Sequence, residues 1–578
     1  MKLPWVWAPN ATRVELVTAS QRNNLEPQAE GIFTAITPAL ESETDYAFQL
    51  DGTGPLPDPR SRWQPNGVHG FSRLFDSKFD WSDQSFRACP LSAGVFYELH
   101  VGTFSTDGTF DGVIPRLPHL SALGITHVEL MPVAEFPGKH GWGYDGVSLF
   151  AAHSGYGGPR ALKRLVDACH AQGLAVILDV VHNHFGPDGN YLPQFGPYLT
   201  DSFHTPWGAA LNLDGPQSGP VRRFLIDSAL QWLEEFHFDG LRLDAVHALF
   251  DRTARHYLRQ LAEEVAVLSD RLARPLVLIA ESDLNDPRLI RSREAGGFGL
   301  DAQWNDDFHH ALHVALTNER HGIYQDFSGL ADLARAFEKG LVYDGRFSRF
   351  RQREHGMPLE DLSFRRLLVF LQNHDQIGNR ARGERIGHLI PASRAKLGAA
   401  LTLLGPFVPL IFQGEEWNAS APFQYFADHV DPELGQKVSE GRRREFSHGG
   451  WAEVEVPDPQ ARETFEASRL DFDEIGRPEH AEMLSFYRHL IRLRRERAEL
   501  SAPRLSVRFD ERSGFFALDR GESVVAVNFG RDTLRVPLSR EENVRPGELL
   551  CATAGAAIEG NTLVLPRDSL IVATLVRS

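Results

Sequence analysis

Three carboxylates in this sequence share one setting, the end of an apolar run of strand length. A charge at the end of a buried strand is costly unless pairing or function compensates for it. Three strands that bring Asp244, Glu281 and Asp375 to one rim would supply the carboxylates that acid/base work on a glycosidic bond requires. The segments are Phe238–Ala248 (FDGLRLDAVHA), Leu276–Asp283 (LVLIAESD) and Leu367–Asp375 (LLVFLQNHD).

The neighbours of these carboxylates predict how the work is divided. Arg242 precedes Asp244 by two residues, shares its strand face, and should keep that carboxylate ionised, as a nucleophile needs. Glu281 follows an apolar run, where desolvation would raise its pKa and preserve a proton for the leaving oxygen. Asp375, beside His374, would hold sugar hydroxyls and stabilise an oxocarbenium-like state. Two carboxyl groups about 5 Å apart would retain the anomeric configuration.

Eight predicted strands would position these side chains. From about residue 94 onward, apolar runs alternate with amphipathic helical patterns, which indicates parallel strands covered by helices. A count of eight predicts an α/β fold, a closed (β/α)₈ barrel, in preference to a doubly wound sheet. Active sites of such barrels lie at the C-terminal strand ends, where all the candidates fall. The strands are predicted near Val95–Leu99, Thr126–Met131, Ala175–Val181, 240–243, 276–280, 300–304, 367–371 and 408–412.

Short alternating β patterns flank the barrel on both sides. We expect an N-terminal β-sandwich over residues 1–88, the catalytic barrel over 89–499, and a C-terminal β-sandwich over 500–578. The barrel carries insertions at about 184–220 and 417–480. Three tryptophans of the first sandwich could form a sugar-stacking surface, although packing within the sandwich and against the barrel is the favoured interpretation. They are Trp5, Trp7 and Trp63.

Composition limits the classes of partner. A net charge of −17 argues against a nucleic-acid partner, and the basic run Arg492–Arg497 is typical of a solvated helix face. Neither an N-terminal signal peptide nor an apolar run long enough to span a membrane is present in the sequence. The cysteines are too few and too dispersed for a disulfide framework, so we expect a cytoplasmic protein. They are Cys89, Cys169 and Cys551.

The chain resembles the α-amylase superfamily of glycoside hydrolases in four segments across the barrel. These are Asp179–His184 (DVVHNH), Gly240–Asp244 (GLRLD), Ala280–Asp283 (AESD) and Asn373–Asp375 (NHD). The resemblance implies that Asp244 is the nucleophile, Glu281 the general acid/base and Asp375 the transition-state stabiliser. The resemblance also implies that Arg242 contacts the nucleophile. It implies that the −1 sugar is contacted by His184, His374 and the stacking Tyr144.

Within that superfamily the chain is most similar to the maltooligosyltrehalose trehalohydrolases. The similar stretches are Gly141–Gly146 (GWGYDG), Gly189–Tyr191 (GNY), Thr205–Gly208 (TPWG), Gln372–Arg380 (QNHDQIGNR) and Pro422–Arg444 (PFQYFADHVDPELGQKVSEGRRR). The resemblance implies retaining hydrolysis of the α-1,4 bond next to the terminal trehalose of maltooligosyltrehalose. The products would be trehalose and a maltooligosaccharide, and a maltooligosyltrehalose synthase would be a functional partner. The acceptor side would use Trp142, Asp145, His247, Gln376 and Phe423, with Ala248 where many amylases carry a histidine.

No cofactor follows from the sequence. Many amylases bind calcium near the asparagine that Asn183 matches, but the insertion after it lacks a set of acidic ligands, so we expect no structural calcium. His182 and His184, two residues apart, are a weak metal pattern, and sugar binding is the preferred interpretation.

Three alternatives share the same sequence features. A glycogen branching enzyme has the same plan and carboxylates but passes the glycosyl group to a sugar hydroxyl. An isoamylase-type debranching enzyme is a further alternative. A non-catalytic glucan-binding protein is disfavoured because the three carboxylates and Arg242 are all intact.

Overall fold

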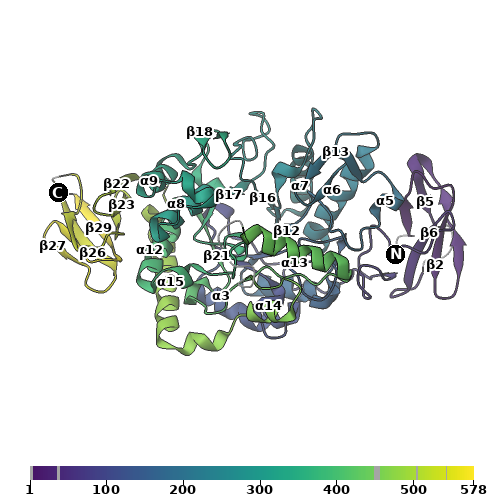
Figure 1. Ribbon diagram of the computed structural model, residues 1–578, viewed down its shortest axis with the longest axis horizontal. Helices are drawn as coiled ribbons and strands as arrows, with labels where there is room; N and C mark the ends of the chain where they lie inside the picture. Colours follow the sequence, from purple (N-terminus) through teal and green to yellow (C-terminus); the bar gives the residue numbers. More distant parts are fainter. Residues whose placement is uncertain (1–3, 36–39, 448–455, 503–504, 542, 578) are drawn as a thin grey trace.

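The computed structural model describes residues 4–35, 40–447, 456–502, 505–541 and 543–577. A barrel occupies the middle of an elongated molecule, with β sheets at either end (Figure 1). Among the described helices, none is both long and apolar enough to cross a membrane.

Eight parallel strands close the central barrel, which confirms the predicted fold class. Their order around the barrel is β12-β15-β16-β17-β20-β21-β8-β9. Inside the barrel, apolar side chains such as Ile177, Ile279 and Phe370 form a separate packed cluster with Trp304. The strands are β8 (Phe96–Leu99), β9 (His127–Leu130), β12 (Ala175–Val180), β15 (Gly240–Leu243), β16 (Val277–Ala280), β17 (Ala302–Trp304), β20 (Leu367–Phe370) and β21 (Val408–Phe412).

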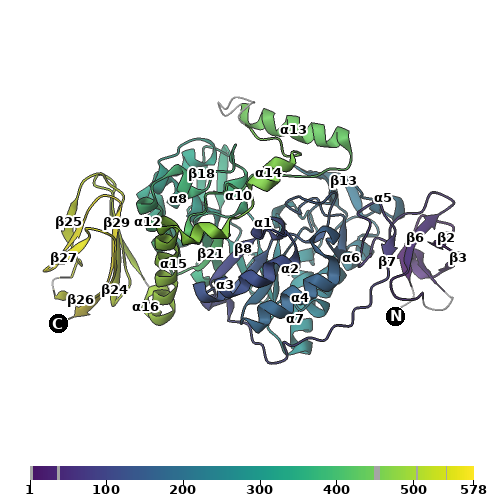
Figure 2. The same cartoon turned by 90° about the horizontal axis from the view of Figure 1, so that it is seen from below.

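Amphipathic helices cover the outside of the barrel. In α4, Leu162, Leu165, Val166 and Cys169 recur at helical spacing and are all buried. Figure 2 shows α3, α4 and α15 along this outer layer. The longer covering helices are α3 (Leu117–Leu123), α4 (Gly158–Ala171), α6 (Ser218–Glu235), α7 (Tyr257–Leu272), α8 (Asp306–Thr317), α9 (Leu330–Lys339), α12 (Ala392–Leu403) and α15 (Pro478–Glu496).

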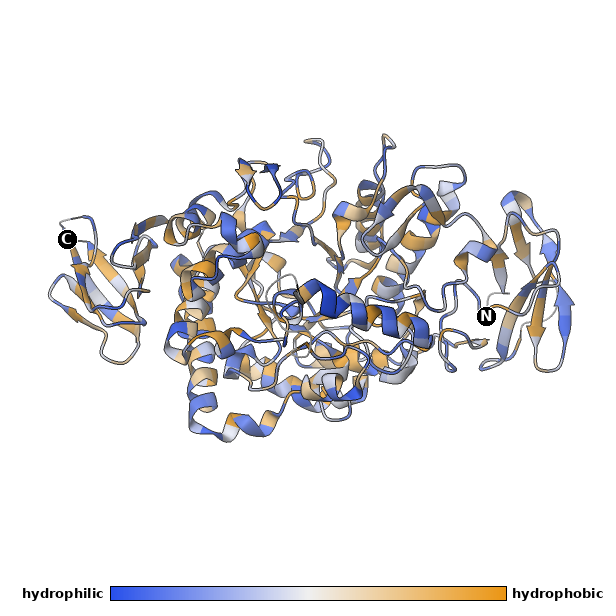
Figure 3. Cartoon of the chain, in the orientation of Figure 1, coloured by the Kyte–Doolittle hydropathy of each residue, from blue (hydrophilic) through white to orange (hydrophobic). Residues whose placement is uncertain are grey.

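Both long insertions contain secondary structure of their own. The first carries α5 (Leu192–Phe195) and the hairpin β13 (Leu199–Thr205) with β14 (Gly208–Leu211). The second carries α13 (Pro432–Ser447) and α14 (Arg462–Ala467), while its residues 448–455 lie outside the described part. Figure 2 shows that α13 lies outside the barrel, at a distance from its other helices, and Figure 3 shows that it is largely hydrophilic.

Paired sheets form the two ends of the molecule. The N-terminal sheets have the orders β1-β5-β4 and β3-β2-β6-β7, and the C-terminal sheets β22-β23-β24-β29-β26 and β25-β28-β27. The N-terminal strands are β1 (Trp5–Trp7), β2 (Val14–Thr18), β3 (Arg22–Asn24), β4 (Glu26–Pro27), β5 (Ile32–Thr34), β6 (Asp45–Leu50) and β7 (Ser72–Arg73). The C-terminal strands are β22 (Ser506–Asp510), β23 (Phe515–Asp519), β24 (Ser523–Asn528), β25 (Leu534–Pro537), β26 (Val544–Ala552), β27 (Ala557–Glu559), β28 (Thr562–Leu565) and β29 (Ser569–Arg577).

The tryptophans of the first sandwich do pack against neighbouring segments. The Trp7 ring meets Tyr198 edge-to-face at 5.2 Å, and Trp63 meets Phe75 in the same way at 6.5 Å. Trp5 lies under the guanidinium of Arg60, at 4.7 Å, but remains partly exposed.

Close strand packing at Gly240 generates a stability prediction. A Cβ added there would lie 2.5 Å from the carbonyl oxygen of Val277 and 2.9 Å from Cδ1 of Ile177. Because the backbone of β16 cannot move away without disturbing the barrel, Gly240→Ala should cost about 1–3 kcal/mol and lower Tm in a thermal scan. Gly54→Ala, where a Cβ meets nothing within 4 Å, is the control and should leave Tm unchanged. Equal melting of the two variants would contradict this packing.

Candidate active site

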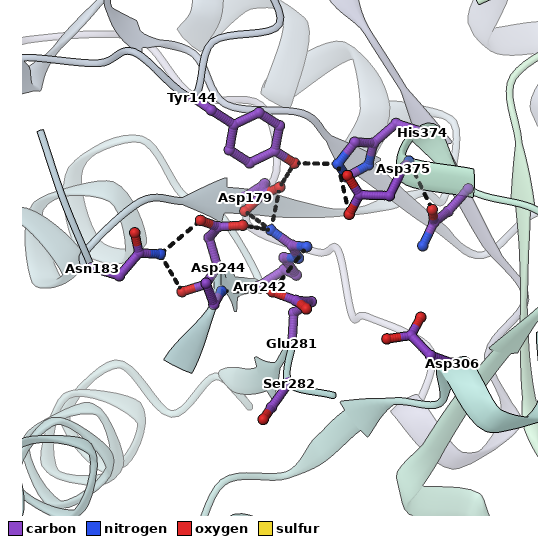
Figure 4. Close-up of polar contacts among 12 residues, drawn as sticks. Tyr144, Asp179, Asn183, Arg242, Asp244, Glu281, Ser282, Asp306, His374 and Asp375 are labelled. Atoms are coloured by element: carbon purple, nitrogen blue, oxygen red, sulfur yellow. Dashed lines mark hydrogen bonds and ion pairs between the residues drawn. The ribbon is translucent and has the colours of Figure 1, made fainter. Parts of the chain in front are cut away.

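The hydrogen-bond ladder of the barrel continues one residue beyond β15 and β16. The amide of Asp244 donates to the carbonyl of Val180 at 3.1 Å, and the amide of Glu281 donates to the carbonyl of Leu243 at 3.0 Å. The two carboxylates therefore stand on adjacent strand ends at the same rim, as the sequence predicted (Figure 4).

A single buried guanidinium joins these carboxylates. Arg242 Nη1 lies 2.7 Å from Asp244 Oδ1, and Nη2 lies 3.7 Å from Glu281 Oε2. Nη1 also donates to both oxygens of Asp179 on β12, at 2.9 Å. The guanidinium carbon of Arg242 lies over the ring of Trp304, 4.3 Å from its centre. One fully buried cation thus serves three acidic side chains (Figure 4).

Neighbouring groups fix the orientation of Asp244. The side-chain amide of Asn183 donates to its Oδ2 and to its main-chain carbonyl, both at 2.7 Å. The next residue, Ala245, has a left-handed backbone (φ 38°), which is strained for a residue with a side chain. That conformation lets the amide of Ala245 donate to Glu281 Oε2 at 2.6 Å.

Asp375 enters the site from the first turn of α10 (His374–Gly378). Asn373 caps this helix, because its side chain accepts from the amides of Asp375 and Gln376, while the Gln376 side chain accepts from the amide of Asn373. The side chain of Asp375 is 43% exposed and lines the cleft; its Oδ1 accepts from the side-chain amide of Asn379 at 3.2 Å, and its Oδ2 lies 3.5 Å from His374 Nε2.

His374 is held between an acidic and a phenolic partner. Its Nδ1 contacts Glu98 Oε1, and its Nε2 lies 2.9 Å from the hydroxyl of Tyr144. Since the Tyr144 hydroxyl donates to Asp179 Oδ2 at 2.6 Å, it can accept a hydrogen bond from a doubly protonated imidazole. Tyr144 and His374 also stack, with ring centres 5.2 Å apart.

Electrostatics separate the protonation states of these groups. Burial raises the pKa of Glu281, as expected from the sequence; Arg242 opposes this rise, whereas Asp244 and Asp375 add to it. Burial likewise raises the pKa of Asp179 to about 7. Burial alone would lower the pKa of His374, but the carboxylates of Asp375 and Glu98 prevail and raise it to about 9.

A cleft of about 630 Å³ opens above these residues. It brings together Asp244, Glu281 and Asp375, as predicted, with six of the predicted binding residues. Those six are Trp142, Tyr144, Asp145, His184, His247 and His374.

Three predicted binding residues are not among the residues that line the cleft. Arg242 is fully buried beneath the carboxylates, where it contacts Asp244, as expected of the nucleophile's partner. Phe423 is also fully buried, with its ring stacked on that of Trp142 at 5.4 Å, and therefore supports the cleft wall from behind. Gln376 is occupied by the α10 cap and by a 3.3 Å contact of its amide with Asp306. The weak metal candidate His182 instead contacts the hydroxyl of Tyr257, at 2.9 Å.

Other side chains of the cleft were not predicted. Trp207 stacks on His184 with ring centres 5.1 Å apart, and it lies in TPWG, one of the stretches that carry the family resemblance. Tyr425 follows Phe423 in a second such stretch, and from α13 Arg442 and Glu445 reach the cleft. Nothing in the polar pattern of that insertion indicated which side chains would do so.

The described residues contain no group of three or more His, Cys, Asp or Glu side chains arranged to hold a metal ion. The side chain of Asn183 is instead engaged with Asp244 and with the Nδ1 atom of His184.

Comparisons with known proteins give the same picture. A family profile for the α-amylase catalytic domain matches residues 74–196. The chain is 50% identical over 561 residues to the malto-oligosyltrehalose trehalohydrolase of Arthrobacter ramosus, covering 96% of this chain and 97% of that one. It is 37% identical to the solved structure of a putative α-amylase from Salmonella typhimurium, with a TM-score of 0.89 and coverage of 99% and 97%. A 1,4-α-glucan branching enzyme of Vibrio parahaemolyticus is 36% identical, over 42% of this chain and 36% of its own length.

The raised pKa of His374 predicts a pH-dependent stability. Because its pKa rises from 6.5 to about 9, the imidazolium stabilises the fold fully below about pH 6.5, and that stability is lost as the pH rises through about 9. The gap in Tm between wild type and His374→Gln should therefore shrink from about pH 6 to about pH 10. Val267→Ala, at an exposed side chain that cannot titrate, is the control and should show a small gap that does not vary with pH. A gap for His374→Gln that does not vary with pH would contradict the assignment.

Proposed function

The chain belongs to the malto-oligosyltrehalose trehalohydrolase family, and we propose that it hydrolyses the α-1,4-glucosidic bond next to the terminal trehalose of maltooligosyltrehalose. The products are trehalose and a shortened maltooligosaccharide, and the anomeric configuration is retained. End-to-end similarity to the A. ramosus enzyme is the observation that carries this proposal. Similarity to the branching enzyme, in contrast, covers less than half of this chain.

In the first step, Asp244 attacks the anomeric carbon of the sugar in the −1 position. The Arg242 cation and the Asn183 amide each engage one of its oxygens, at 2.7 Å, which supports an ionised nucleophile in a fixed orientation. Glu281, with its raised pKa, gives its proton to the glycosidic oxygen as that bond breaks. Trehalose leaves, and the maltooligosyl group is esterified to Asp244.

In the second step, water replaces trehalose beside Glu281, which is now an anion. Glu281 takes a proton from the water, the hydroxide attacks the same anomeric carbon, and the ester bond to Asp244 breaks. Asp375 stabilises the positive charge that develops on the ring in both steps, and its exposed carboxylate allows direct contact with sugar hydroxyls. Tyr144 and His374 form the stacked pair against which the −1 sugar rests.

The acceptor side is proposed to involve three further cleft residues. Trp142 offers an indole whose N–H is fixed by the carbonyl of Gln424 at 2.9 Å, so the ring is a rigid platform. Asp145 lies 3.5 Å from His429, and His247 stands beside the acid/base carboxylate in the lining of the cleft. Hydrogen-bonding groups next to an aromatic plane are suited to a disaccharide leaving group.

The setting of the enzyme is part of the same proposal. Its substrate is an α-glucan chain, and a maltooligosyltrehalose synthase would supply it. The three cysteines are unpaired, which suits a reducing compartment such as the cytoplasm. We further propose residues 1–88 as the N-terminal domain, 89–499 as the catalytic domain and 500–578 as the C-terminal domain.

The acid role of Glu281 can be tested by substitution. Glu281→Gln keeps the shape of the side chain but removes the transferable proton, so turnover should fall at least about a hundredfold, with little change in Tm. Glu354→Gln, an exposed position on the hairpin strand β19 (Arg353–Gly356), is the matched control and should retain full turnover. Turnover of Glu281→Gln within a few-fold of wild type would mean that another group is the acid.

The reaction itself is tested by product analysis. Incubation with maltooligosyltrehalose should release abundant trehalose, whereas Asp244→Ala should release essentially none. New α-1,6 linkages from maltooligosaccharides, without trehalose, would identify a branching enzyme instead. Equal activity of wild type and Asp244→Ala would indicate a glucan-binding protein without catalysis of its own.

A further inference from the structure

A second cavity lies between the N-terminal sheet and the barrel. It has a volume of about 310 Å³ and is lined by residues of β1 and β5 on one side and of α6 and the segment after α5 on the other. We propose that it is a second carbohydrate site, which binds a short segment of α-glucan away from the catalytic cleft. The choice of glucan as ligand rests on the proposed function.

Aromatic rings give this cavity a rigid apolar wall. Trp7 is fixed by its indole N–H, which donates to the carbonyl of Glu30 at 3.1 Å, and by the edge-to-face contact with Tyr198. Trp5 is partly exposed and is backed by the guanidinium of Arg60. Because Trp7 and Tyr198 are almost fully buried, they form the floor of the cavity, and Trp5 presents the indole face that a pyranose ring can meet. A mostly apolar hollow at a domain boundary is a common setting for small ligands.

Polar groups at the same cavity are held in place but keep hydrogen-bonding capacity. Asp227 binds both arginines of the cavity, Arg60 at 2.8 Å and Arg223 at 2.6 Å. Each guanidinium has five N–H donors, so donors remain for a ligand. Within the described residues, the hydroxyl of Tyr198 and the indole N–H of Trp5 form no hydrogen bond with the protein, although both rings line the cavity.

The charge balance selects a neutral ligand. Arg60 pairs with Asp227, Arg223 pairs with both Asp227 and Glu264, and the exposed carboxylate of Glu30 stands at the rim. No excess of positive charge is left to attract phosphate or a polyanion. Fixed donors, one exposed carboxylate and aromatic planes together suit a neutral polyhydroxyl chain.

The first insertion connects this cavity with the catalytic cleft. Tyr198 belongs to the same insertion as Trp207, which lines the cleft, but the two sites share no lining residue. A glucan held at the second site would raise the effective concentration of chain ends near the cleft.

Gly219 offers a way to block the cavity without disturbing its walls. It lies in the first turn of α6 and lines the cavity, and a Cβ added there meets nothing within 4 Å. Gly219→Phe should therefore fill the space while the protein folds normally. Gly476→Phe, at another glycine whose Cβ would meet nothing within 4 Å, is the matched control far along the chain.

The test is calorimetric titration of the full chain with maltotriose, in a Glu281→Gln background that prevents turnover. We expect two sites in this parent and in Gly476→Phe, and one site in Gly219→Phe. Tyr198→Phe, which keeps the ring, should weaken the second site about fivefold through loss of one hydrogen bond. With Glu281 intact, Gly219→Phe should release trehalose from a short maltooligosyltrehalose at the wild-type rate.

Several outcomes would overturn the inference. If the parent binds maltotriose at one site only, or if neither Gly219→Phe nor Tyr198→Phe alters its two sites, this cavity is not a carbohydrate site. Normal release of trehalose in that case would leave the proposed function intact. Failure to release trehalose would instead overturn the proposed function. If Gly219→Phe melts far below wild type, Tyr198→Phe alone decides.

Discussion

One buried cation shared by three carboxylates is the interaction on which the active site depends. Arg242 has no exposed surface, and a buried charge is destabilising unless it is paired and hydrogen-bonded. Here the pairing is with Asp179, Asp244 and, at longer range, Glu281. One positive charge cannot balance three negative ones in a medium that excludes water, so the groups cannot all ionise freely. Burial is the main cause of the raised pKa values of Glu281 and Asp179, and the neighbouring carboxylate of Asp244 raises both further.

This electrostatic arrangement needs the exact register of the barrel. Asp179 and Arg242 are direct neighbours across β12 and β15, and Arg242 faces Ile279 across β15 and β16. A shift of one residue would turn Arg242 away from the barrel interior, because alternate side chains point to opposite faces. The closed sheet and the Trp304 ring under the guanidinium together fix the position of the cation.

Much of this could be predicted from the sequence, for a physical reason. Strands buried on both faces are rich in apolar residues, so the eight barrel strands and the three carboxylates at their ends could be predicted, although β17 (AQW) carries only a short, mixed run. The direction of side chains outside regular strands could not be predicted, because it depends on contacts with residues far along the chain. Phe423 packs behind Trp142, and Gln376 turns back to cap α10. Neither orientation has a signal in the residue types.

The least predictable part of the site is the wall of the cleft that α13 supplies. Helix α13 is largely polar, yet Arg442 on it is nearly buried and donates to the carbonyl of Gly378, at the end of the helix that carries Asp375. Its guanidinium also lies over the rings of Tyr425 and Phe446. The wall of the cleft supplied by α13 is thereby connected to the segment that carries Asp375. The three carboxylates alone do not distinguish the proposed hydrolase from the alternative branching enzyme, so any difference between the two must come from walls of this kind, whose placement depends on a few long-range contacts.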